Sequence, residues 1–166
     1  MKIYLIRHSN AVDPGTSGNE DDSLRPLTEK GRDKMKEIAL SLKALELKPD
    51  LIVSSPYIRA RETAEILAKV LKYRKELLFN DALVPTGAAD DIIGEINEKY
   101  SVDELVLVGH EPCLSSLAGT LIAENPNLGI ELKKGGVCCL SVDNLRTERK
   151  AFLEWLLTPK ILTGLS

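Results

Sequence analysis

The sequence predicts an α/β protein, a three-layer α/β/α sandwich with a mostly parallel central sheet. Short apolar runs alternate with amphipathic segments along the 166 residues, which is typical of parallel strands covered by helices. The chain has two histidines, and each follows one of these runs after a single intervening residue. His8 follows residues 2–6, and His110 follows residues 104–108. Because ligands bind at the carboxyl ends of parallel strands, we expect both imidazoles in one site.

The segment after the first strand, residues 11–26, is polar and rich in Gly, Asp, Ser and Asn, so we expect a long loop beside His8. Within it, the acidic stretch Glu20-Asp21-Asp22 is expected to be solvated. Thr28 then caps a helix. The expected apolar face of this helix is formed by Met35, Ile38, Ala39, Leu42 and Leu45.

Residues 51–53 are expected to form the second strand. Ser55 followed by Pro56 has the pattern of an N-cap and a first helical residue, so the next helix is expected to begin there. The remaining expected elements are a short edge strand at 77–79, a helix marked by Ile92, Ile93, Ile96 and Tyr100, a helix opened by Pro112, a strand at 137–142, and a hairpin partner at 151–157.

Composition and charge narrow the class of protein. The length suits a single domain, residues 1–166. A net charge of -3 argues against nucleic-acid or membrane-surface binding, and charges interrupt every apolar run before it could span a bilayer. The N-terminal apolar run is too short for a secretory signal, so a cytoplasmic protein is expected.

The three cysteines, Cys113, Cys138 and Cys139, form an odd set without C-x-x-C spacing. We therefore expect reduced core residues and neither a disulfide framework nor a zinc site. Two histidines in the whole chain also argue against a histidine-rich metal centre, and no cofactor is expected.

Arg7, His8, Arg59 and His110 are the residues expected to carry chemistry. Arg7-His8 stands at a strand end, Arg59 falls in the first turn of the expected second helix, and His110 precedes another helix. Guanidinium groups and helix N-termini bind phosphoryl oxygens, and a neutral imidazole is a good nucleophile near pH 7. The pattern favours nucleophilic phosphoryl transfer in which arginines, without a metal, neutralise the transferring group.

These residues also lie in motifs that resemble the histidine phosphatase superfamily, the phosphoglycerate mutase-like proteins. Leu5-Ile6-Arg7-His8 resembles its R-H signature, residues 54–64 resemble its S-S-P-x-x-R-A-x-x-T-A segment, and Val108-Gly109-His110 resembles its third motif. The short chain and residues 25–31, Arg-Pro-Leu-Thr-Glu-Lys-Gly, are most similar to SixA-type phosphohistidine phosphatases. The resemblance runs from residue 2 to about residue 143.

The resemblance implies that His8 is the phosphorylated nucleophile and that Arg7, Arg59 and His110 bind the phosphoryl oxygens. Ser9 stands where most members have glycine, and its hydroxyl is either tolerated or adds a hydrogen bond to the substrate. Arg25 lies in the loop beside the site and either clamps substrate phosphate or belongs to the surface.

The general acid is the open question. Larger members supply it from an insertion that this chain is too short to contain, and the local candidates match no motif. They are Asp81, Asp90, Asp91 and Glu95. Expelling imidazole, whose conjugate acid has a pKa of about 6.5, needs less acid catalysis than expelling an alkoxide.

The expected function is therefore that of a metal-independent phosphohydrolase, with protein phosphohistidine, such as that of a signalling phosphotransfer domain, as substrate. Two alternatives stay open. One is a broad small-molecule phosphomonoesterase with Asp90 or Asp91 as acid, and the other is a phosphate or phosphopeptide binding module without turnover. The sequence does not indicate an oligomeric state.

Overall fold

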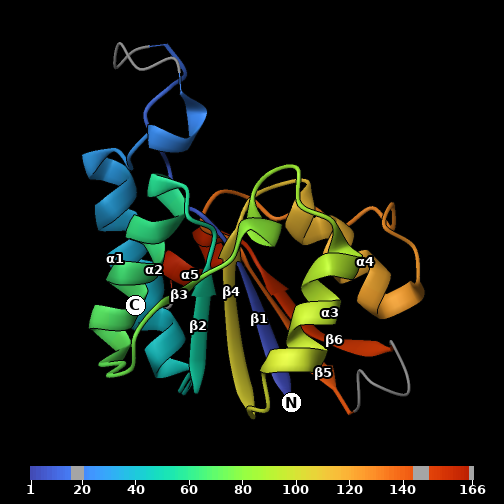
Figure 1. The fold of residues 1–166 in the computed structure, drawn as a ribbon. Helices are drawn as coiled ribbons and strands as arrows, with labels where there is room; N and C mark the ends of the chain where they lie inside the picture. Colours follow the sequence, from blue (N-terminus) through green and yellow to red (C-terminus); the bar gives the residue numbers. More distant parts are fainter. Residues whose placement is uncertain (16–20, 144–149, 165–166) are drawn as a thin grey trace.

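The computed structural model describes residues 1–15, 21–143 and 150–164, and its centre is a six-stranded sheet (Figure 1). The strands are β1 (Lys2–Arg7), β2 (Leu51–Ser54), β3 (Leu78–Phe79), β4 (Glu104–Gly109), β5 (Val137–Val142) and β6 (Ala151–Leu157). They lie in the order β3-β2-β4-β1-β5-β6. The pairs β3–β2, β2–β4 and β4–β1 are parallel, whereas β5 pairs antiparallel with both β1 and β6. The predicted mostly parallel sheet and the hairpin partner are confirmed.

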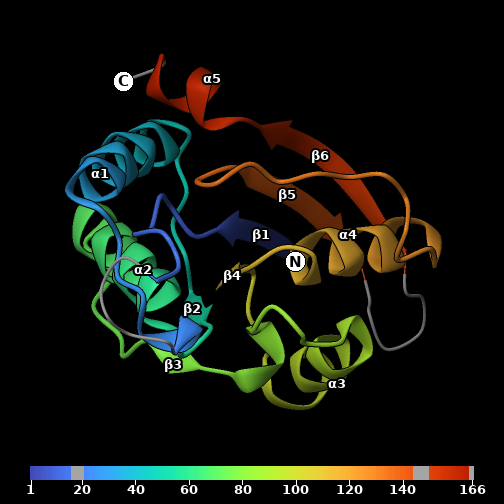
Figure 2. The ribbon, with the colours of Figure 1, turned by 90° about the horizontal axis from the view of Figure 1, so that it is seen from above.

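Helices cover both faces of the sheet, as Figure 2 shows from above. The helices are α1 (Glu29–Ala44), α2 (Ile58–Leu71), α3 (Ala89–Lys99), α4 (Cys113–Ala123) and α5 (Pro159–Thr163), with 3₁₀ turns η1 (Asp22–Leu24) and η2 (Asp81–Leu83). One face carries α1 and α2, with α5 beside α1, and the other carries α3 and α4. The predicted three-layer architecture is confirmed.

Side-chain alternation along the central strands builds two separate cores. In β1, Ile3 and Leu5 pack on the side of α3 and α4, whereas Tyr4 and Ile6 pack on the side of α1 and α2. The strand β4 alternates in the same way, because successive side chains of a strand point to opposite faces. Both central strands are therefore buried on both faces, which fixes the register of their carboxyl ends.

The three cysteines are buried and unpaired, as expected from the sequence. Among the described residues, no group of His, Cys, Asp and Glu could hold a metal ion, and no helix is long and apolar enough to cross a membrane.

The structure corrects several details of the sequence-based expectation. The second helix begins at Ile58 with Tyr57 as its N-cap, so Ser55 is not an N-cap and Pro56 is not the first helical residue. Leu45 is 48% exposed because it follows the last turn of α1 and lies off its apolar face. The short helix α5 was not expected from the sequence. The loop of residues 11–26 contains the turn η1, and its residues 16–20, Glu20 included, lie outside the described part.

Candidate active site

The two histidines meet because their strands are neighbours in register. Arg7 of β1 pairs with Gly109 of β4, and His8 and His110 follow directly. The backbone N–H of His8 donates to the Gly109 carbonyl at 3.0 Å. The ring centroids of His8 and His110 lie 5.0 Å apart, and both rings are almost fully buried. The expected convergence of the two imidazoles is therefore present.

The hydrogen bonds of His8 define which ring nitrogen carries its lone pair. The Nδ1 atom lies 2.7 Å from the Ser9 carbonyl oxygen, which can only accept, so Nδ1 carries the proton. The Nε2 atom is 3.3 Å from Nε of Arg59, which can only donate. Nε2 therefore holds the lone pair and is the nucleophilic atom of the ring.

His110 has the same Nδ1–H tautomer for a different reason. Its Nε2 lies 2.9 Å from Oγ of Ser55, and that hydroxyl already accepts the Tyr57 N–H. A hydroxyl has a second lone pair, but among the described residues Nε2 of His110 is the acceptor that lies within reach of the Ser55 proton, so we assign the hydroxyl as the donor. The ring proton then resides on Nδ1, which is buried and has no partner in the described protein. His110 thus presents a buried N–H donor.

Arg59 reaches the histidines from the first turn of α2. Its side chain is 3% exposed, and its Nε faces Nε2 of His8. The ring of Tyr57, which also contacts His110, lies 5.2 Å from the guanidinium carbon. Thr63 donates to the Arg59 carbonyl at 2.7 Å and accepts the Ser9 N–H at 3.2 Å, so one side chain joins α2 to the segment after β1.

Arg7 completes the cluster at the end of β1. One of its terminal nitrogens donates to the Leu132 carbonyl at 2.7 Å, but its Nε is buried and has no partner. Within the described residues, Nε of Arg7 and Nδ1 of His110 are the buried side-chain nitrogen or oxygen atoms without a hydrogen-bond partner. Buried polar groups are normally satisfied, so two such N–H donors beside one nucleophile point to a ligand rich in oxygen.

The electrostatics of the cluster keep both imidazoles neutral. Burial, reinforced by Arg59 and Arg7, lowers the pKa of His8 to about 3. Burial, with smaller contributions from His8 and Arg59, lowers the pKa of His110 to about 2. A neutral ring is the nucleophilic form. The cluster therefore combines a neutral nucleophile with two permanent cations, which suits a phosphoryl dianion.

Ser9 and Arg25 do not direct their donors at the cluster. The Ser9 hydroxyl donates to the Gly31 carbonyl at 2.8 Å, so its proton holds the start of α1 and is not available to a substrate. Arg25 uses Nε and one terminal nitrogen on Asp22, at 2.7 and 2.6 Å, and its other terminal nitrogen on the Val12 carbonyl at 2.8 Å. Within the described residues, the polar contacts of both side chains are therefore with Gly31, Asp22 and Val12 and not with the four central residues.

The four carboxylates expected from the sequence as candidate acids lie elsewhere. Asp81, Asp90, Asp91 and Glu95 line a surface hollow of about 970 Å³ beside β3 and α3, and none of the four central residues lines it. Glu95 accepts from Asn80 at 2.8 Å and pairs with Lys99.

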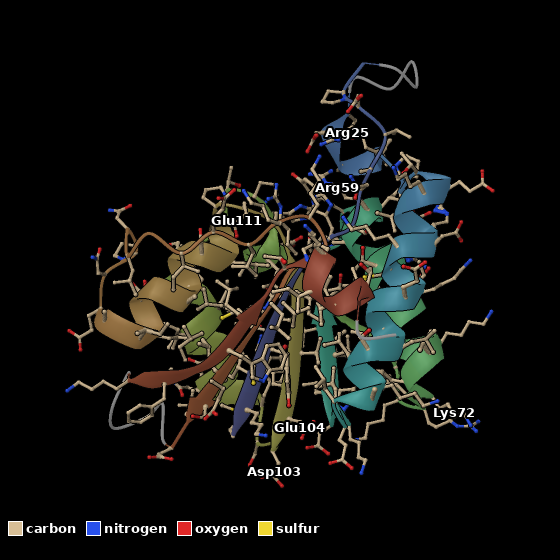
Figure 3. The ribbon with its side chains drawn as sticks, turned by 180° about the vertical axis from the view of Figure 1, so that it is seen from behind. Arg25, Arg59, Lys72, Asp103, Glu104 and Glu111 are labelled. Carbon is tan, nitrogen blue, oxygen red and sulfur yellow. The ribbon has the colours of Figure 1, made fainter. Side chains whose placement is uncertain are left out.

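Asp22, a carboxylate that the sequence did not suggest as an acid, lies at the cluster, and Glu111 lies at the same end of the sheet. Asp22 contacts Arg59 directly, and Glu111 follows His110. Figure 3 shows Arg25, Arg59 and Glu111 at one end of the sheet, opposite Asp103 and Glu104. Asp22 also pairs with Arg25, three residues further along the chain.

Sequence comparison agrees with this site. A model described as the histidine phosphatase superfamily (branch 1) matches residues 3–83, which include Arg7, His8 and Arg59. An uncharacterised protein of Picosynechococcus sp. is 33% identical over 167 residues, 95% of this chain and 99% of that protein. The mitochondrial serine/threonine-protein phosphatase Pgam5 of Drosophila melanogaster is 36% identical over 86 residues. These cover 52% of this chain and 28% of that relative's own length.

Solved structures share the fold along nearly the whole chain. The protein histidine phosphatase SixA, in complex with tungstate, matches with a TM-score of 0.85 and 22% identity, covering 98% of this chain and 99% of its own. A provisionally assigned phosphohistidine phosphatase SixA of Agrobacterium tumefaciens matches with a TM-score of 0.78 and 25% identity, covering 95% of this chain and 97% of its own. A provisionally assigned alpha-ribazole-5'-P phosphatase of Escherichia coli matches with a TM-score of 0.76 and 17% identity, covering 96% of this chain and 97% of its own. The chain belongs to the histidine phosphatase superfamily and is one of its phosphatases.

Proposed function

We propose that the chain is a protein phosphohistidine phosphatase that works through a phosphohistidine on Nε2 of its own His8. The observation that carries the proposal is the pair of buried, unpartnered N–H donors, Nε of Arg7 and Nδ1 of His110, beside the lone pair of His8. Two oxygens of one phosphoryl group would satisfy both donors. Arg59 would supply further N–H groups to that phosphoryl group from the side where its Nε faces His8.

The reaction needs two displacements at phosphorus. In the first, the lone pair on Nε2 of His8 attacks, a new N–P bond forms, and the bond from phosphorus to the leaving group breaks with its electron pair going to that group. In the second, water attacks the phosphohistidine, the N–P bond returns its electron pair to Nε2, and the water proton passes to the medium with release of inorganic phosphate. Arg7, Arg59 and His110 would stabilise the charge on the phosphoryl oxygens in both steps.

A phosphohistidine substrate is favoured by the leaving group. Imidazole departs with little acid catalysis, because its conjugate acid has a pKa of about 6.5, whereas an alkoxide needs a proton donor. Asp22, the carboxylate in contact with the cluster, is an ion-paired group and a poor donor. The likeness to the protein histidine phosphatase SixA in complex with the oxyanion tungstate, and to a provisionally assigned phosphohistidine phosphatase, supports the same choice.

The partner is then a protein that carries phosphohistidine, such as a phosphotransfer domain in signal transduction. A cytoplasmic site of action fits the three buried, unpaired cysteines, because thiols stay reduced in that compartment.

Turnover of matched substrates tests the proposal. The unaltered protein should hydrolyse a chromogenic aryl phosphate, whose good leaving group needs no acid, and this activity should survive a metal chelator and be lost in His8→Asn. In a panel of phosphohistidine, phosphoserine, phosphotyrosine and sugar phosphates, phosphohistidine should have the highest kcat/KM. Preferential hydrolysis of sugar phosphates would contradict the proposed substrate, and phosphate binding without any hydrolysis would indicate a binding module.

A second candidate, a broad phosphomonoesterase, is favoured by one observation at Glu111. Burial raises the pKa of the Glu111 carboxyl, which follows His110 and is half buried. Such a carboxyl could protonate an alkoxide leaving group. Glu111→Gln keeps an oxygen for the Ser115 N–H, which Glu111 accepts at 3.2 Å. If the protein is a broad phosphomonoesterase, Glu111→Gln should slow the hydrolysis of alkyl phosphates and leave that of aryl phosphates unchanged. If phosphohistidine is the substrate, Glu111→Gln should leave the hydrolysis of phosphohistidine unchanged as well.

A further inference from the structure

The carboxylate of Asp22 lies between two arginines and joins them. Its Oδ1 accepts from Nε of Arg25 at 2.7 Å and lies 2.6 Å from a terminal nitrogen of the same residue. Its Oδ2 accepts from a terminal nitrogen of Arg59 at 2.8 Å. The backbone carbonyl of Asp22 accepts from the other terminal nitrogen of Arg59 at 2.6 Å. Figure 3 shows Arg25 and Arg59 at the same end of the sheet.

The geometry of the guanidinium group makes this contact directional. A guanidinium is planar and has five N–H donors in fixed positions. The fork formed by the two terminal nitrogens of Arg59 is held by the carbonyl and the carboxylate of Asp22. The Nε–H, on a different edge of the plane, is directed at Nε2 of His8. Asp22 therefore holds one edge and leaves the edge containing Nε turned toward the reacting nitrogen.

Each of the three nitrogens of Arg25 makes a contact in this arrangement. Two of its nitrogens contact Asp22, and the third donates to the Val12 carbonyl at 2.8 Å. Its hydrogen bonds therefore orient the carboxylate and join it to the segment that follows His8.

We propose that Asp22 is a positioning residue for phosphoryl transfer, which orients Arg59 toward the phosphoryl group on His8, and that Arg25 acts through Asp22. This inference rests on the proposed function. It differs from the expectation that Arg25 clamps the substrate itself, and it gives the 3₁₀ turn η1 a role in the reaction. The order of contacts is Arg25, Asp22, Arg59, His8.

The ionisation of Asp22 agrees with positioning and not with proton donation. Partial burial works to raise the pKa of Asp22, but hydrogen bonds from Arg25 and Arg59 outweigh it and hold the pKa below the usual value. The carboxylate is therefore charged at neutral pH. A permanent negative charge can hold a buried arginine in one orientation, but it cannot protonate a leaving group.

A double-mutant cycle at Asp22 and Arg25 tests the inference. The variants are D22N, R25A and the double variant, assayed for kcat and KM with an aryl phosphate. D21N is the matched control, because Asp21 lies in the same turn, loses the same charge and bonds Ser23 instead of an arginine. Misorientation of a group that binds the transition state can cost about 100-fold in rate, so we expect D22N to lower kcat about 10- to 100-fold with little change in KM.

The cycle separates action through Asp22 from direct contact. We expect R25A to lower kcat about fivefold in the unaltered chain and less than about twofold in D22N, because coupled residues are not additive. D21N should leave kcat and KM unchanged. Equal effects of R25A in both backgrounds would show that Arg25 acts on the substrate directly. An unchanged kcat in D22N would show that Asp22 does not position Arg59. A raised kcat in D22N would show that Asp22 competes with the substrate for Arg59. Any of these results would overturn the inference.

Two further measurements keep the test independent of folding and of the proposed function. R25Q, which leaves Asp22 in place, should lower kcat as R25A does, and melting curves of all five variants identify any loss of fold. Calorimetric titration with inorganic phosphate repeats the cycle without turnover, and R25A should weaken binding in the unaltered chain but not in D22N. If the unaltered protein shows no hydrolysis, the proposed function fails, and the phosphate cycle alone decides the role of Asp22.

Discussion

The imidazole rings of His8 and His110 lie 5.0 Å apart, although the two residues are 102 positions apart in the chain. They meet because the backbone N–H of His8 donates to Gly109, which immediately precedes His110. The rings are not equivalent. The Nε2 of His8 has a lone pair facing Arg59, whereas His110 presents a buried N–H at Nδ1. One ring is arranged to attack phosphorus, and the other is arranged to bind an oxygen on it.

This asymmetry predicts different losses in the two histidine variants. His8→Asn removes the nucleophile, so kcat with an aryl phosphate should fall about 10⁴-fold or more, to the level left by binding alone. His110→Asn removes one donor to the transition state, and kcat should fall about 100- to 1000-fold. Rapid acid-free quenching should also yield an acid-labile, alkali-stable phosphoryl label on the unaltered protein and none on His8→Asn. Equal residual rates in the two variants would contradict the assignment of roles.

Ser55 should matter for catalysis through the tautomer of His110. Its hydroxyl lies 2.9 Å from Nε2 of His110, and Ser55→Ala would free that nitrogen to carry the proton instead of Nδ1. We expect kcat to fall about tenfold, as is common when a partner that orients a catalytic histidine is removed. The matched control is Ser54→Ala. Ser54 is equally buried, but its hydroxyl donates to the Ser55 carbonyl, so its removal should lower stability and leave kcat unchanged.

The sequence was sufficient for the parts of the site that depend on backbone pattern. Arg7, His8 and His110 were placed because strand ends follow from apolar runs, and parallel strands bring their carboxyl ends to one edge. Arg59 was placed in the first turn of a helix, although that helix starts three residues after the expected Ser55 cap. In these cases local pattern and tertiary position agree.

The sequence failed where a side chain has a choice of distant partners. Ser55 followed by Pro56 is a common capping pattern, but the Ser55 hydroxyl forms a hydrogen bond with His110, a residue 55 positions away. Asp22 was expected to be a solvated acidic residue because nothing local distinguishes it from Asp21. Only the folded chain shows that it is paired with Arg25 and Arg59. The candidate acids Asp81, Asp90, Asp91 and Glu95 matched no motif, and they line a different hollow.

Gly31 and Gly94 make a matched pair for the packing around His8. A Cβ at Gly31 would lie 2.1 Å from the Asn10 carbonyl oxygen, in the segment that follows His8, whereas a Cβ at Gly94 meets nothing within 4 Å. Gly31→Ala should lower the free energy of unfolding by about 1–3 kcal/mol and reduce kcat, because the segment must shift. Gly94→Ala should raise stability by about 0.5–1 kcal/mol, because Gly94 lies within α3, and leave kcat unchanged. Denaturant unfolding and aryl phosphate assays on both variants check this.

The lowered pKa values of the two histidines predict a specific acid sensitivity. Burial keeps His8 and His110 neutral in the fold down to pH values of about 3 and 2, whereas in the unfolded chain they take up protons near pH 6.5. Between these limits the unfolded chain binds more protons, so stability is fully present above about pH 6.5 and declines as the pH falls. Each histidine can contribute a slope of up to about 1.4 kcal/mol per pH unit. Denaturant unfolding of the unaltered protein, His8→Asn and His110→Asn at pH 4, 5, 6 and 7 should show a smaller slope in each variant. An unchanged slope in both would mean that the rings take up protons without unfolding.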